Sequence, residues 1–173
     1  MNKNDGGTTA STASITEALD PDLLDRIASQ TLARELQLGE ATFNPLLDLA
    51  DRLVERKNWT EAFDLFSRLG LVDPANLDVQ LGLARCATGL GEHEIAIKAA
   101  ANVIRLAPSD PRGYLLSGKN CLMIGQLQEA REDLADAVRL AGDETALAAQ
   151  ASLLLSQLET LDPGKSGKQS TRG

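Results

Sequence analysis

The chain has 173 residues, and its net charge of −8 argues against a general nucleic-acid-binding protein, which needs a basic face for phosphates. Hydrophobic residues make up 43% of the chain but aromatic residues only 3%, so we expect one domain with an aliphatic core, as in packed helices. No apolar run approaches the roughly 20 residues that span a bilayer, and the N-terminus lacks the apolar stretch of a signal peptide, so we expect a cytoplasmic protein.

Residues 1–19 are rich in Ser, Thr, Ala and Gly and show no repeating apolar face, so a disordered tail is predicted. Asp20 and Pro21 then provide a helix start, and a leading helix is predicted over residues 21–38, ended by Gly39. Its apolar stripe consists of Leu23, Leu24, Ile27, Ala28, Leu32 and Leu36. This helix has two interpretations: a cap over the helices that follow, or an arm through which two copies form a homodimer.

From residue 43 onward the sequence repeats itself with a period of 34 residues. Ala62, Ala96 and Ala130 mark the period most clearly, and Pro74 and Pro108 keep the same interval. Such a period is the signature of the tetratricopeptide repeat, a helix–turn–helix unit that stacks into a superhelix. The sequence therefore predicts an all-α tetratricopeptide-repeat superhelix with three repeats, at residues 43–76, 77–110 and 111–143.

Each repeat is predicted to pair two helices across a short turn. The first helices are expected at residues 43–56, 77–89 and 111–124, and the second at 59–69, 93–106 and 127–140. Small residues let the paired helices approach closely, and these pairs are Ala50 with Ala62, Ala84 with Ala96, and Gly118 with Ala130. An amphipathic helix at residues 144–161 is expected to cap the C-terminal end of the stack, as solenoids require. The domain would then span residues 20–161 in eight helices, and residues 162–173 would form a second disordered tail.

The concave groove of such a superhelix is the candidate binding site, because the first helix of each repeat lines it. The groove-facing positions, taken from their offsets in the repeat, hold Leu47, Asp51 and Val54, then Leu81, Arg85 and Thr88, then Leu115, Lys119 and Leu122. One leucine per repeat beside a polar row suits an extended peptide with spaced apolar anchors. The alternative is that the leucines only fill contacts between helices.

No residue pattern indicates catalysis, a metal site or a cofactor. His93 is the only histidine and has no partner at a fixed spacing, so a solvated position at a helix end is expected. Cys86 and Cys121 form no C-x-x-C pair, and we interpret them as reduced apolar fillers rather than as a metal or redox pair. A clamp for a C-terminal carboxylate, as in tetratricopeptide co-chaperones, is not expected, because Asp51 would repel that group.

Several short motifs of the chain resemble one tetratricopeptide family. They are Gln30-Thr31-Leu32-Ala33, Trp59-Thr60-Glu61-Ala62, Leu81-Gly82-Leu83-Ala84-Arg85-Cys86, Leu90-Gly91 and Asp110-Pro111-Arg112. Together with the plan of one leading helix, three repeats and one closing helix, they resemble the class II chaperones of type III secretion translocators (the SycD/LcrH type).

This resemblance implies a bacterial cytosolic chaperone rather than an enzyme. Such a protein holds a hydrophobic secreted translocator before export, and binds an extended segment of it in the concave groove. The resemblance also implies a homodimer through the leading helices. The family often carries aromatic residues where this chain has Leu47, Asp51 and Val54. The alternative function is a tetratricopeptide adaptor or scaffold in a stable protein complex.

Overall fold

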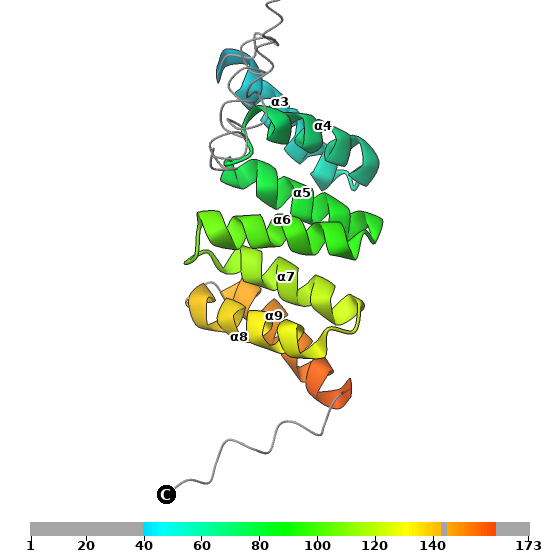
Figure 1. The fold of residues 1–173 in the computed structure, drawn as a ribbon, viewed down its shortest axis with the longest axis vertical. Helices are drawn as coiled ribbons and strands as arrows, with labels where there is room; N and C mark the ends of the chain where they lie inside the picture. Colours follow the sequence, from blue (N-terminus) through cyan, green and yellow to red (C-terminus); the bar gives the residue numbers. More distant parts are fainter. Residues whose placement is uncertain (1–39, 143–144, 162–173) are drawn as a thin grey trace, which may run out of the picture.

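The computed structural model describes residues 40–142 and 145–161, and this part of the chain consists of helices joined by short turns. The helices are α3 (Glu40–Glu55), α4 (Trp59–Val72), α5 (Leu77–Leu90), α6 (His93–Leu106), α7 (Pro111–Met123), α8 (Leu127–Ala141) and α9 (Thr145–Leu161). They stack one above another along the long axis of the molecule (Figure 1), which confirms the predicted all-α tetratricopeptide fold. None of these helices is long and apolar enough to cross a membrane. The leading helix and both tails predicted from the sequence lie outside the described residues.

The helices form two layers, which differ in whether a helix contacts its equivalent in the next repeat. Helices α3, α5, α7 and α9 each contact the next helix of this set, and we call them the inner helices. Among the described residues, the outer helices α4, α6 and α8 contact only the helices that precede and follow them in the chain. Since the inner helices lie closer together than the outer ones, the stack curves and its concave side is the inner layer.

Side-chain caps start two of the inner helices. At the start of α5, the backbone N–H of Val79 donates to Asn76 Oδ1 at 3.2 Å. At the start of α7, the N–H of Arg112 donates to Asp110 Oδ1 at 2.9 Å, and Pro111 takes the first helical position, where no N–H donor is needed. Helix α3 starts earlier than the sequence predicted, at Glu40, and contains Pro45.

The turn between the two helices of each repeat contains one residue in the left-handed backbone conformation, and this residue recurs every 34 positions. The N–H of the residue after it donates to a carbonyl five residues back, at 2.9 Å in each case: Asn58 to Leu53, Glu92 to Ala87, and Gln126 to Cys121. The left-handed residue is Gly91 in the second repeat (φ 79°) and Gly125 in the third (φ 77°), but Lys57 in the first (φ 57°). Glycine adopts this conformation without a steric cost, whereas a side chain clashes with the backbone.

Small residues set the distance between the paired helices. Ala50, Ala84, Ala62, Ala96 and Ala130 are all fully buried, as the sequence predicted. The buried Gly118 replaces alanine in the third repeat, where a Cβ would lie 2.7 Å from Leu134 Cγ. A further close approach was not predicted: a Cβ on Gly82 would lie 2.3 Å from the ring of Phe66, which is fully buried. The core therefore leaves no room for added volume at these positions.

The three turn residues with left-handed backbone conformation yield a stability prediction. Replacing Lys57 by glycine should raise the free energy of unfolding by about 1 kcal/mol, because it removes the strain of a side chain in this conformation. The reverse change, Gly91→Lys, should lower it by about the same amount, since a Cβ there would meet nothing within 4 Å and only the backbone conformation is affected. Urea unfolding followed by circular dichroism measures both. Unchanged midpoints in both variants would show that the turn is not strained.

The alanine column yields a second prediction, with a control on the same helix. Ala96→Leu should destabilise the protein by about 1–3 kcal/mol, because three extra carbons cannot fit between the paired helices. Ala101, also on α6, is exposed, so Ala101→Leu should change stability by no more than about 0.5 kcal/mol. Thermal melts compare the two variants, and equal melting temperatures would contradict close packing at Ala96.

Candidate functional site

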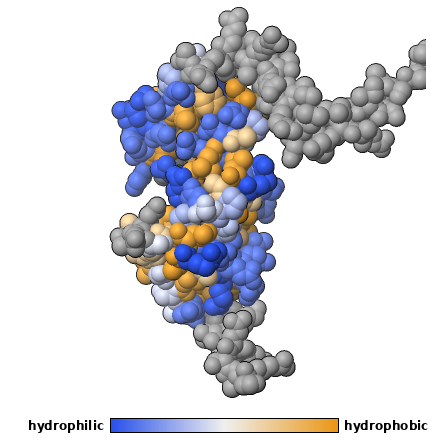
Figure 2. Space-filling model, turned by 90° about the vertical axis from the view of Figure 1, so that its left-hand side faces the viewer, coloured by the Kyte–Doolittle hydropathy of each residue, from blue (hydrophilic) through white to orange (hydrophobic). Residues whose placement is uncertain are grey.

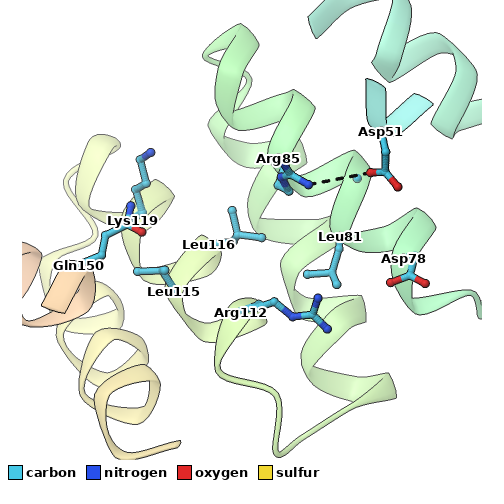
Figure 3. A pocket seen from close by; sticks show the side chains of 10 residues that line it. Asp51, Asp78, Leu81, Arg85, Arg112, Leu115, Leu116, Lys119 and Gln150 are labelled. Atoms are coloured by element: carbon cyan, nitrogen blue, oxygen red, sulfur yellow. Dashed lines mark ion pairs between the residues drawn. The ribbon is translucent and has the colours of Figure 1, made fainter. Parts of the chain in front are cut away.

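A cavity of about 410 Å³ lies on the inner layer and is bordered by helices α3, α5, α7 and α9. Its apolar floor is formed by Leu81, Gly82, Leu115 and Leu116. Its polar rim is formed by Asp51, Asp78, Arg85, Arg112, Lys119 and Gln150 (Figure 3). Figure 2 shows, from the side of the stack, that hydrophobic surface also interrupts the hydrophilic surface over the middle of the molecule. The cavity thus combines an aliphatic floor with a charged edge.

The leucines of the floor belong to the core as well as to the cavity. Leu81 is only 6% exposed and Leu115 only 9%. Leu115 packs in one buried cluster with Leu134 and Ala151, which joins α7 to α8 and α9. Both interpretations from the sequence therefore apply to the same side chains, because each leucine fills helix contacts and shows one side to the cavity. Leu47 packs in the core of the first repeat and does not border the cavity.

Two ion pairs involve the charged rim. Arg85 Nη1 lies 4.0 Å from Asp51 Oδ1, and both side chains are about half exposed (49% and 51%), so this pair is weak. Arg112 Nη2 lies 2.6 Å from Asp110 Oδ2, and this bond holds the pKa of the Asp110 carboxyl below its ordinary value. Burial is the main reason that the pKa of Asp51 is raised, and the nearby Asp78 carboxylate adds to the rise.

Besides Leu47, three more of the positions predicted to face the groove do not border the cavity. Val54 is 3% exposed in the core of the first repeat. Thr88 Oγ1 donates to the Ala84 carbonyl at 2.8 Å, and Leu122 packs against the cluster around Leu158. These three residues occupy one column, seven positions after the leucines. Their side chains pack or hydrogen-bond inside the stack, and the residues that do line the cavity lie closer to the N-terminal ends of α5 and α7.

The lining residues that the sequence analysis did not select form two columns of the same repeat. Asp78 and Arg112 are 34 residues apart, as are Gly82 and Leu116. Together with the predicted residues they lie at i, i+3, i+4 and i+7 on α5 and again on α7, which is one face of a helix. The helical period could therefore have identified these residues, but the predicted stripe was extended towards the C-terminal end of each helix, whereas the lining residues extend towards the N-terminal end. Gln150, on the capping helix, has no equivalent in the repeats.

His93 is the first residue of α6, as the sequence predicted, but its half-buried side chain belongs to a polar network instead of being solvated. Its Nδ1 lies 2.8 Å from Oδ1 of Asn120, which is fully buried. Asn120 Nδ2 also donates to Thr88 Oγ1 at 2.8 Å and to the Leu116 carbonyl at 2.7 Å. Because Asn120 uses both ends of its amide, the network ties α5, the start of α6 and α7 together directly beside the cavity.

The two cysteines are buried thiols. Cys86 is fully buried, and burial raises its pKa to about 11. Burial is also the main reason that the pKa of Cys121 is raised. At neutral pH both are protonated and are poor nucleophiles, which fits their interpretation as apolar fillers. In the described part of the chain, no group of three or more His, Cys, Asp or Glu residues is placed to hold a metal ion.

The sequence and the structure are both similar to known proteins. The sequence model of the tetratricopeptide repeat family matches residues 53–119. The low calcium response locus protein H of Yersinia pestis is 24% identical over 131 residues, which cover 76% of this chain and 78% of that protein.

Two solved structures are similar in both sequence and fold. One is PcrH, a Pseudomonas aeruginosa protein, in complex with the chaperone binding region of PopD; it is 26% identical, with a TM-score of 0.68, over 72% of this chain and 96% of the other. The second is a T3SS complex from Aeromonas hydrophila, 25% identical, with a TM-score of 0.73, over 84% of this chain and 100% of the other. These findings confirm the family resemblance drawn from the sequence.

Proposed function

Because the chain is a tetratricopeptide-repeat protein similar to the translocator chaperones of type III secretion, we propose that it binds an extended segment of a secreted translocator-like protein and holds that protein before export. The bound segment lies in the concave cavity. Complexes of PcrH with the chaperone binding regions of PopD and of PopB support this function, since both structures are similar to this chain.

The cavity is the observation that carries the proposal. Its floor offers aliphatic carbon from two successive repeats, at Leu81 on α5 and at Leu115 and Leu116 on α7. Burying one aliphatic anchor of a ligand on such a floor is worth about 1.5–3 kcal/mol, which can dominate the affinity of a short segment. A translocator segment held there would keep its own apolar residues away from water until export.

The proposal includes a non-enzymatic role in the cytoplasm. The PcrH structures hold the chaperone binding regions of PopD and PopB, which supports binding rather than catalysis. His93, the only histidine of the chain, is engaged with Asn120 in the polar network. The cytoplasm is the compartment in which an export chaperone meets its newly made cargo.

Affinity purification from the native host tests the proposal, with two variants for comparison. Leu116 is the most accessible leucine of the floor, and Leu116→Gln replaces its branched apolar end by a polar amide on a side chain only one atom longer. We expect the wild-type chain to capture a secreted membrane-active protein, identified by mass spectrometry, and Leu116→Gln to weaken this binding about tenfold or more. Leu71→Gln is the matched control, because Leu71 is 62% exposed on the outer helix α4 and should not affect capture.

Thermal melts of the same variants separate binding from folding. Both variants should retain the helical signal, and the control should melt as the wild type does. Capture of a stable, folded assembly instead of an export cargo would overturn the proposal in favour of an adaptor or scaffold. Equal capture by the folded Leu116→Gln variant would show that the cavity is not the binding site.

We also propose a homodimer that forms through residues 21–38. None of the described helices covers the outward face of the first repeat, and Leu49 on α3 is 42% exposed whereas the equivalent Leu83 on α5 is partly buried. In the second repeat, the residues of this face pack against the preceding repeat, with Gly82 against Phe66. An apolar segment that precedes α3 would cover this face and offer its remaining leucines to a second copy.

Deletions test this arrangement. A chain without residues 1–19 should keep the oligomeric state of the full chain, because the apolar stripe of residues 21–38 remains. A chain without residues 1–38 should shift towards the monomer or become insoluble, since an apolar face is exposed. Light scattering over a range of concentrations measures both, and a full chain that is monomeric throughout would rule out the dimer.

A further inference from the structure

The charges on the cavity rim are distributed unequally along the stack. Asp51 on α3 and Asp78 on α5 lie at one end of the cavity, and Lys119 on α7 lies at the other (Figure 3). The acidic end is reinforced from outside the cavity, because the carboxylates of Asp48 and Glu55 also act on Asp51. A segment that crosses the cavity therefore meets negative charge over its first part and positive charge over its last part.

The two arginines of the rim are already compensated. Arg112 forms a short ion pair with Asp110, and Arg85 lies 4.0 Å from Asp51. Lys119, in contrast, makes no hydrogen bond or ion pair with any described residue, although its side chain borders the cavity. Lys119 is thus the cation that a ligand can pair with. At the opposite end the carboxylates of Asp51 and Asp78, together with Asp48, Glu55 and Asp110, outnumber the two arginines beside them (Figure 3).

We propose, as a refinement that rests on the function proposed above, that the cavity selects extended segments in which an aliphatic anchor lies between a basic and an acidic residue. The anchor rests on Leu81, Leu115 and Leu116. The basic residue lies at the end formed by Asp51 and Asp78, and the acidic residue pairs with Lys119. This charge pattern opposes a uniformly acidic or uniformly basic ligand, because one of its ends would always meet like charge.

The geometry of the inner layer gives the spacing of the two charges. Packed helices have axes about 8–10 Å apart, so α3 and α7 are separated by about 16–20 Å across α5. An extended chain rises about 3.3 Å per residue, and it therefore covers this separation in about five or six residues. The basic and acidic residues of the ligand should lie at this spacing, with the aliphatic anchor near the middle.

Three capped peptides with one central leucine test the selection. They differ only at two flanking positions six residues apart, which carry one Lys and one Glu, two Glu, or two Lys. The mixed peptide should bind about fivefold more tightly than either of the others, as expected for partly exposed ion pairs. This order does not depend on the chain direction of the bound peptide, since a mixed peptide can match the rim in either orientation. The preference should vanish at high salt.

A charge reversal at Lys119 tests whether this residue causes the preference for the mixed-charge peptide. In Lys119→Glu both ends of the cavity are acidic, so the peptide with two Lys should become the tightest ligand. Lys98→Glu is the matched control, because Lys98 is exposed on the outer helix α6 and the change in net charge is the same. This control should keep the order of the wild type. Fluorescence anisotropy of labelled peptides gives the three dissociation constants for each protein.

The outcomes separate this inference from the proposed function. Equal affinities for the three peptides, tightest binding of a like-charged peptide, or the same change of order in the control variant would overturn the charge selection. Failure of all three peptides to bind would overturn it too. In each of these cases the capture experiment decides separately on the proposed function, because it depends on the apolar floor and on a natural cargo.

Discussion

The close approach of helices at small residues is the constraint on which the rest of the structure depends. Fully buried Ala62 and Ala96 bring the paired helices together, and Gly82 lets the ring of Phe66 rest against the backbone of α5. The same glycine borders the cavity, where the equivalent position in the next repeat carries Leu116. The absence of a side chain at Gly82 therefore admits a core aromatic ring at the position from which the same residue borders the cavity.

The sequence predicts the fold well because a repeat shows its pattern three times. Helix bounds, turns and the alanine columns follow from the period and from the size of single residues. The site was harder to predict, because the exposure of a column depends on the curvature of the whole stack. Leu47, Leu81 and Leu115 share one offset, yet only the last two border the cavity. Asp78 and Arg112 share another offset, but their opposite charges conceal their common position.

Residues that break the period could not be assigned from the sequence. Asn120 has Cys86 as its equivalent one repeat earlier, and Thr88 has Leu122 one repeat later. A polar residue at a position that is apolar in the other repeats needs a hydrogen-bond partner in the core, and the sequence does not say which residue that partner is. Here the bonded residues come from three different helices. In a stack of similar units, such exceptions fix how one particular unit sits on the next, and with it the shape of the cavity.

The left-handed Lys57 has a consequence for how the stack opens. In a solenoid each unit contacts only its neighbours, so a local cost in stability remains local. The first repeat carries this strain, whereas the second and third are joined by the network around Asn120. Backbone amides of α3 and α4 should therefore exchange their hydrogens for deuterium sooner than those of α6 and α7, through partial unfolding that spares the rest. The end of the cavity that holds Asp51 would then open first, and a bound segment would begin to detach at its basic residue.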